Sequence, residues 1–280
     1  MANSDLRPMT LGEVLDRTFT LYRENFLLFA GITALPYLLM LVFRFGVLLI
    51  ERGKIAGTTP NLASPGMVGG ILLGAVGGAF LLLLMTGIAH AATITAVSDL
   101  YLGRPTSVRD AYSRAKGSIL TVIAILVMSG LATLVGFLLL IIPGIYLACR
   151  LAISVPVAIV EKESPVASME RSMELTKGYA GQMFLLLLLV GVLGWVVGML
   201  FQFPAMFFTF TAVMAKQQPS IGVTAYTYVA EFVSQVLVGP IGTISASLMY
   251  YNLRVRKEGF DIQHLLSSLD SVPRPLSPGI

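Results

Sequence analysis

Long apolar runs separated by short polar segments dominate the chain. Most of these runs exceed the roughly 20 residues with which a helix crosses about 30 Å of hydrocarbon. The pattern therefore predicts an all-α fold, a polytopic integral membrane helix bundle with six transmembrane helices arranged as three hairpins. The runs cover about residues 26–50, 67–97, 118–142, 143–160, 181–209 and 222–250.

The fourth run leaves two interpretations open. After the break at Pro143-Gly144, about 16 apolar residues remain before Glu161, enough for roughly 24 Å of helix. The segment either crosses the bilayer as a short helix or re-enters it, and the second case would leave five full spans.

Two polar stretches far apart in the chain share a helical pattern. They are RPMTLGEVLDRT, which begins at residue 7, and RPTSVRDAYSRA, which begins at residue 104. In both, apolar or neutral residues occupy one helical face and charged residues occupy the other. Both also carry the capping-box pattern of a hydroxyl followed three residues later by an acid: Thr10 with Glu13 and Ser107 with Asp110.

A more degenerate third copy, SPVASMERSMELTKG, covers residues 164–178. It matches the others if one residue is inserted after Pro165, which aligns Ser168 with Ser107. Each copy stands directly before a pair of spans. We expect three short amphipathic interfacial helices that lie in the headgroup layer with the apolar face toward the lipid.

The chain is therefore expected to be a single integral membrane domain over residues 1–280. It contains three pseudo-repeats, each a short helix followed by a transmembrane hairpin, at about 8–98, 105–161 and 165–251. Residues 252–280 are expected to form a cytoplasmic amphipathic segment and a flexible, proline-rich tail. The apolar face of that segment comprises Ile262, Leu265, Leu266 and Leu269.

The distribution of Lys and Arg predicts the orientation. Six spans put both termini on one side, and fourteen of the 19 basic residues lie on that side, against three on the other. Because cytoplasmic loops carry the basic excess, both termini are expected in the cytoplasm of a multi-pass cell membrane protein. The net charge of +4 then reflects this orientation and an attraction to anionic lipid headgroups at the cytoplasmic face, so no nucleic-acid partner is expected.

Composition and motifs argue against an enzyme. Only 12% of the residues are charged, against about a quarter in soluble domains. With Cys149 as the single cysteine and His90 and His264 as the only histidines, no Cys/His metal cluster can form and no cofactor is expected. The sequence carries no Walker A loop, nucleophile elbow or zincin motif.

Three ionisable residues lie at one depth inside predicted spans. Arg44, Arg150 and Glu231 are each roughly 9–14 Å from the exterior end of their span. An isolated charge at this depth costs at least about 2.5–3.5 kcal/mol, and glutamate is too short to reach the interface. We expect Glu231 to pair with Arg150, with Arg44 as the alternative partner. The pair either fixes the helix register or forms a substrate or proton site.

Small residues at four-residue spacing, which let helices approach closely, occur on two spans. They either pack helices within one chain or form a homodimer interface. Prolines inside spans predict kinks. The small residues are Gly70, Gly74 and Gly78 on the second span and Gly194 and Gly198 on the fifth, and the prolines are Pro36, Pro156 and Pro240.

Three segments together resemble a known family. They are TLGEVLDRTFTLYRENF, IIPGIYLACRLAISVPVAIVEKESPVASMERSMELTKG and YYNLRVRKEGFDIQ. With these segments the chain resembles, over nearly its whole length, the bacterial membrane-domain family of glycerophosphoryl diester phosphodiesterase. Where the resemblance implies an aspartate before Leu253, this chain has Asn252. Some members carry a fused phosphodiesterase barrel, but six spans leave no room here for a barrel of about 250 residues, so the resemblance implies a stand-alone membrane member.

Two hypotheses of different classes follow. The first is a non-enzymatic scaffold or accessory module that binds lipid or a membrane protein partner through its cytoplasmic helices. The alternative is a transporter or lipid-handling protein with a polar site at Arg150 and Glu231, since internal repeats, kinked spans and intramembrane charges are typical of transporters.

Overall fold

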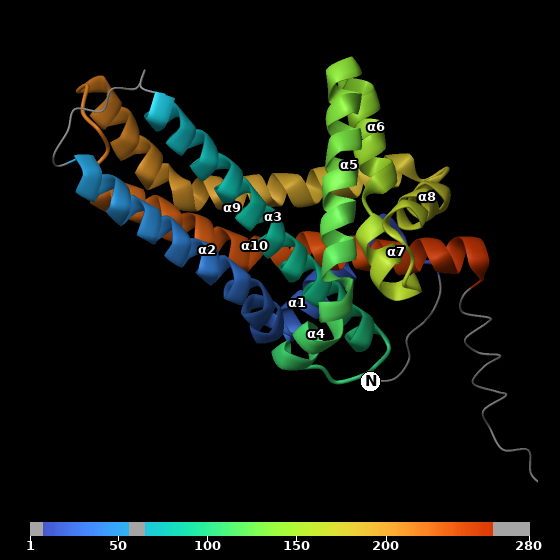
Figure 1. The fold of residues 1–280 in the computed structure, drawn as a ribbon. Coiled ribbons are helices and arrows are strands. Elements are labelled where there is room, and N and C mark those ends of the chain that lie inside the picture. The colour runs from blue at the N-terminus through green and yellow to red at the C-terminus, as the bar shows by residue number, and fades with distance from the viewer. Residues whose placement is uncertain (1–7, 56–64, 260–280) are drawn as a thin grey trace, which may run out of the picture.

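The computed structural model describes residues 8–55 and 65–259, and every regular element in these ranges is a helix (Figure 1). Six helical segments are long and apolar enough to cross a bilayer. This confirms the predicted all-α polytopic bundle. The segments are Phe26–Leu49, Val76–Tyr101, Val108–Leu139, Ile141–Glu161, Ala180–Met214 and Ile221–Glu258.

Short and long helices follow one another in the order that the three predicted units require. Each short helix precedes two long helical segments, and the second segment of the middle unit is divided into two helices. The bounds are α1 Leu11–Glu24, α2 Phe26–Ile55, α3 Pro65–Tyr101, α4 Val108–Ala115, the 3-10 turn η1 Lys116–Ser118, α5 Ile119–Leu139, α6 Ile141–Leu151, α7 Ser154–Glu161, α8 Pro165–Thr176, α9 Ala180–Met214 and α10 Ile221–Glu258.

The last helix is longer than predicted. α10 continues to Glu258 because Asn252, Leu253 and Val255 are buried against other helices, which extends its packed face. The helix therefore runs past the predicted boundary at residue 252. Residues 260–280, which include the predicted amphipathic segment and tail, lie outside the described residues.

The long helices form two arms that diverge from one end of the molecule (Figure 1). α2, α3, α9 and α10 run together in the first arm, and α5 and α6 pair as a separate hairpin in the second. We call the end where the arms join the base; it comprises α1, α4, α7, α8 and the adjoining parts of the long helices. The main cluster of buried hydrophobic side chains lies there and includes Val14, Phe29, Val97, Val122, Leu175, Leu248 and Tyr250.

The outer parts of both arms expose large apolar side chains. At the tip of the second arm, Leu138 and Ile142 are 78% and 80% exposed, and Leu200 of α9 is 72% exposed. Apolar surface on this scale is stable only when lipid or another protein covers it. The exposure therefore agrees with a protein whose arms lie in a bilayer.

The short helices lie where the sequence predicts them, but protein covers their apolar faces. Val14 and Thr18 of α1 and Ala111 of α4 have no exposed surface. The hydroxyl of Tyr112 in α4 donates a hydrogen bond to the carbonyl of Ile32 in α2. The expectation that these faces lie in the lipid headgroups is therefore wrong, because the long helices leave apolar surface at the base that the short helices bury.

The predicted caps of the first two short helices are present. The hydroxyl of Thr10 accepts from the amide of Glu13 at 3.4 Å, and the Glu13 carboxylate accepts from the amide of Thr10 at 2.7 Å, which completes a capping box. The hydroxyl of Ser107 accepts from the amide of Asp110 at 3.2 Å. These local hydrogen bonds fix where α1 and α4 begin.

The third short helix begins earlier than its predicted alignment. Ser164 is the cap of α8, its hydroxyl accepts from the amide of Ala167 at 3.4 Å, and Pro165 occupies the first helical position. Proline is common at the first helical position because its fixed φ angle is already close to the helical value. Ser168 is fully buried inside the helix, so its alignment with the cap Ser107 is wrong.

Hydrogen bonds attach both ends of α1 to α10. The buried Asn252 side chain accepts from the amide of Met9 at 2.8 Å and donates to the carbonyl of the same residue at 3.0 Å. The asparagine amide can make both bonds, whereas an ionised aspartate at this position would have no proton to donate. Tyr22 donates to the carbonyl of Leu237 at 2.7 Å, and burial raises the pKa of its phenol.

A network of charged side chains joins α7, α8 and α10 at the base. Arg171 of α8 pairs with Glu161 of α7 at 3.3 Å and with Glu258 of α10. Arg254 of α10 pairs with Glu258 at 3.1 Å and lies 3.7 Å from Glu161. The hydroxyl of Tyr250 donates to Glu161 at 2.8 Å. Each arginine thus bridges the same two acids, which ties three helices together.

The fourth span is a broken helix. The backbone of Leu140 is extended and ends α5, so the turn precedes the predicted break at Pro143, and that proline lies in the first turn of α6, where a missing N–H is tolerated. A second break separates α6 from α7. The hydroxyls of Ser172 and Thr176 donate to the carbonyl of Arg150 at 2.8 and 3.2 Å, which satisfies a group near the end of α6 that lacks a helical partner.

The hairpin of α5 and α6 requires glycine at its closest point. A Cβ atom at Gly136 would lie 2.9 Å from the Cα atom of Gly144, closer than packed carbon atoms approach. We expect Gly136→Val to lower the free energy of unfolding by about 1–3 kcal/mol through overpacking, measured as a fall in the thermal midpoint in detergent. Gly130→Val on the same helix is the control, because a Cβ atom there meets nothing within 4 Å. Equal midpoints for the two variants would contradict this packing.

Candidate functional site

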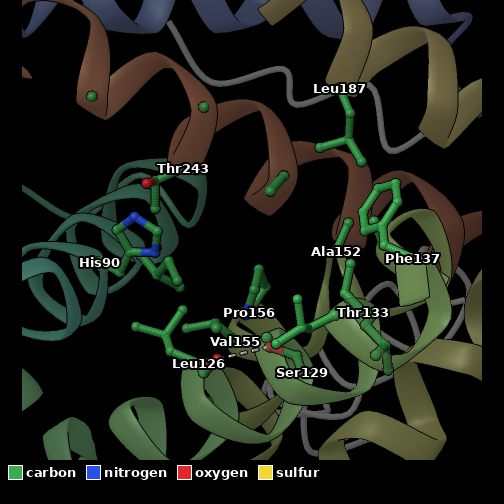
Figure 2. Close-up of a pocket in the computed structure, with 18 residues that line it drawn as sticks. His90, Leu126, Ser129, Thr133, Phe137, Ala152, Val155, Pro156, Leu187 and Thr243 are labelled. Carbon is green, nitrogen blue, oxygen red and sulfur yellow. Dashed lines mark hydrogen bonds between the residues drawn. The ribbon is translucent and has the colours of Figure 1, made fainter. Parts of the chain in front are cut away.

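A cavity of about 700 Å³, which we call the crevice, lies between the two arms (Figure 2). The residues of α5 that line it recur at three- and four-residue spacing and so form one helical face. α3 and α10 supply much of the opposite wall. The α5 face comprises Leu126, Ser129, Gly130, Thr133, Leu134 and Phe137, and the other lining residues include His90, Ile94, Val155, Leu187, Gly239, Gly242 and Thr243.

The crevice is apolar apart from four side chains that can form hydrogen bonds. His90 of α3 and Thr243 of α10 lie at one end, and Ser129 and Thr133 lie on α5 (Figure 2). Within the described part of the chain, the side chains of His90, Thr133 and Thr243 have no hydrogen-bond partner. Ser129 only reaches the carbonyl of Leu126 at 3.5 Å. The crevice thus offers free donors and acceptors among apolar walls.

A second cavity of about 480 Å³, which we call the chamber, lies among α2, α3, α9 and α10 inside the first arm. It shares His90, Gly239 and Gly242 with the crevice, so the two spaces meet there. The α9 wall consists of residues at four-residue spacing, Val190, Gly194, Gly198 and Gln202. The polar side chains on the other walls are Tyr37, Thr86, Glu231, Ser234 and Gln235.

Glu231 pairs with Arg44 and not with Arg150. The Arg44 guanidinium donates to the Glu231 carboxylate and lies 5.6 Å from the centroid of the Tyr228 ring. α2 and α10 are neighbours in the first arm, which brings the two side chains together. The expected Arg150 pairing is therefore wrong, and the alternative partner is the one observed.

Arg150 belongs to the other arm. It lies near the end of α6, and its guanidinium is 5.6 Å from the centroid of the Tyr146 ring on the same helix. Arg150 and Glu231 lie at the same predicted distance from the exterior ends of their spans. That distance does not specify which helices are neighbours. Arg150 lines neither the crevice nor the chamber.

Among the described residues, most glycines of the predicted stripes contact no neighbouring helix. A Cβ atom at Gly74, Gly78 or Gly198 would meet nothing within 4 Å. A Cβ atom at Gly194 would reach Val238 only at ordinary contact distance, 3.5 Å. On α9 the glycines widen the chamber by leaving its wall without side chains.

The candidate site residues that the sequence prediction did not include, among them Thr86, Gln235 and Thr243, carry a periodic signal. On α10, Glu231, Gln235, Gly239 and Thr243 are small or polar residues at four-residue spacing, which places them on one face. On α3, His90 follows Thr86 at the same spacing. Polar residues on one face of an apolar helix indicate an interior surface. A search for such faces would have identified both cavity walls.

The chemistry of the two cavities suits binding through hydrogen bonds. Among the described residues, no group of three His, Cys, Asp or Glu side chains is placed to hold a metal ion. No protein-family model, curated protein or solved structure matches the chain. The function is therefore inferred from the geometry of the cavities.

The ion pair can be tested by exchanging its charges. We expect Glu231→Ala to destabilise the fold by about 1–3 kcal/mol and Glu231→Gln by less, because glutamine keeps a hydrogen bond to Arg44. The double variant Arg44→Glu with Glu231→Arg should recover part of the loss in thermal midpoint. The control exchange, Arg150→Glu with Glu231→Arg, should recover none. Rescue by the Arg150 exchange alone would contradict the observed pair.

Proposed function

We propose that this protein is a non-enzymatic multi-pass membrane module that binds a lipid molecule between its two arms. The crevice is the observation that carries this proposal. Ligand sites are typically cavities of about 300–1,000 Å³ with apolar walls and a few convergent polar groups. The crevice, at about 700 Å³ with four hydrogen-bonding side chains, has both properties.

The lipid chain would lie between the hairpin and the first arm. Phe137 of α5 and Leu187 of α9 border the same end of the crevice (Figure 2). A hydrocarbon chain placed between them buries apolar surface on both sides, and this packing favours a specific site over the general lipid annulus. The polar end of the lipid would then reach His90 and Thr243.

This proposal favours the lipid-binding module over a transporter of charged solutes. Glu231 is the only charged residue lining either cavity within the described chain, and Arg44 neutralises it.

We also propose that the chain belongs to the membrane-domain family of glycerophosphoryl diester phosphodiesterase. In support, two of the resembling segments contact each other at the base, where α7 and α8 of one segment join the end of α10 in the other.

The lipid site can be tested by filling it. Gly130 of α5 lines the crevice and Leu131 beside it is 57% exposed without lining it. We expect Gly130→Trp to lower the lipid retained by purified protein about tenfold, by native mass spectrometry, and Leu131→Trp to leave it unchanged. A photoactivatable acyl chain should label the α5 peptide around Thr133 in the wild-type protein. Equal retention in both variants would overturn the proposal.

We further propose that the base faces the cytoplasm of a cell membrane, as the excess of Lys and Arg there suggests. The test uses a Cys149→Ala background with one new cysteine at either end. In intact cells a membrane-impermeant maleimide should label Gln217→Cys, which lies beyond α9, and should not label Arg109→Cys on α4. Labelling of Arg109→Cys from outside would show the opposite orientation.

A further inference from the structure

We infer that the bound lipid has an uncharged polar head of the diacylglycerol type, held where the crevice meets the chamber. The inference rests on the proposed function and specifies the class of lipid. A small pocket among α2, α3 and α10 lies at this junction, and its polar lining side chains include His90 of α3 with Gln235 and Thr243 of α10. These three side chains face this common space.

Each of these side chains needs a partner that the protein does not supply. Neutral histidine has one donor and one acceptor, glutamine has two donors and an acceptor, and threonine has a hydroxyl that does both. Within the described residues, none of the three side chains forms a hydrogen bond. Polar groups inside a membrane protein are costly unless satisfied, so the junction favours a ligand with several hydrogen-bonding atoms.

The charge balance of the site selects an uncharged head. Glu231 lines the chamber and is neutralised by Arg44, so the junction has no cation left to pair with a phosphate. An unpaired headgroup charge away from water is strongly unfavourable. Diacylglycerol carries a hydroxyl and two ester carbonyls without a charge, which matches the donors and acceptors of the three side chains.

The cavity shapes place the two ends of this lipid. The crevice, with apolar walls apart from its few hydroxyls, takes the acyl chains, while the head lies at the junction and extends toward the chamber. Gly198 leaves the chamber wall open, since a Cβ atom there would meet nothing within 4 Å. A larger residue at this position can therefore fill the chamber without disturbing the surrounding helices.

The experiment compares two lipids with identical chains, dioleoylglycerol and dioleoylphosphatidylglycerol. The full-length protein in nanodiscs receives both at equal mole fraction, and retained lipid is measured by native mass spectrometry. We expect at least about tenfold preference for dioleoylglycerol. Thr243→Val and Gln235→Leu should each reduce its retention about tenfold and leave phosphatidylglycerol unchanged. Gly198→Leu should reduce it too, whereas the exposed Gly191→Leu on the same helix should not.

The outcomes separate this inference from the proposed function. Equal or stronger retention of phosphatidylglycerol, still lowered by Gly130→Trp, would refute the uncharged head and leave the lipid site intact. Retention that no crevice or chamber variant changes would refute both. If Gln235→Leu does not give a monodisperse protein, the isosteric Thr243→Val decides: unchanged dioleoylglycerol retention in that variant overturns the junction as the head site.

Discussion

The burial of the C-terminal half of α10 in the base is the constraint on which the rest of the structure depends. This part of the helix contacts short helices and long helices alike, and Leu248, Tyr250 and Leu253 are almost or fully inaccessible. Two of its polar side chains are satisfied by other elements: Asn252 by the backbone of Met9 and Tyr251 by Ser98 at 2.9 Å. Because buried polar groups must be paired, these bonds specify one arrangement of the surrounding helices.

The divergence of the two arms follows from where this packing is concentrated. Val122 and Ile125, near the start of α5, are buried in the base, whereas Leu131 and Leu138 farther along are exposed. In water the exposed length would collapse onto the first arm, because apolar surface avoids water. Lipid removes that driving force, since hydrocarbon chains solvate leucine as well as another helix does. A crevice between the arms is therefore stable in a bilayer.

The bilayer also raises the free-energy cost of leaving the polar side chains of the cavities without hydrogen-bond partners. A free imidazole or amide costs little at a wet surface, but away from water each one requires a partner. The base meets most of this requirement with internal hydrogen bonds and the charged network of Arg171 and Arg254, although the buried hydroxyl of Ser168 has no partner among the described residues. His90 and Gln235 also lack a partner within the described chain, but unlike the buried Ser168 they line open cavities, which is why we propose a ligand there.

The sequence by itself determined the type of the elements and the position of most of them. The apolar runs set the spans through the free energy of transfer into lipid, and the local bonds of Thr10 and Ser107 set the starts of α1 and α4. These features depend on neighbours along the chain. Other features depend on residues far apart in the chain. They are the partner of Glu231, the covered faces of the short helices and the two cavities. From three charges at one depth the sequence favoured Arg150 as the partner, with Arg44 as the alternative. Only the tertiary structure decided for Arg44, by placing α2 beside α10 and α6 in the other arm. Helix neighbours are set by side-chain packing among all the helices at once.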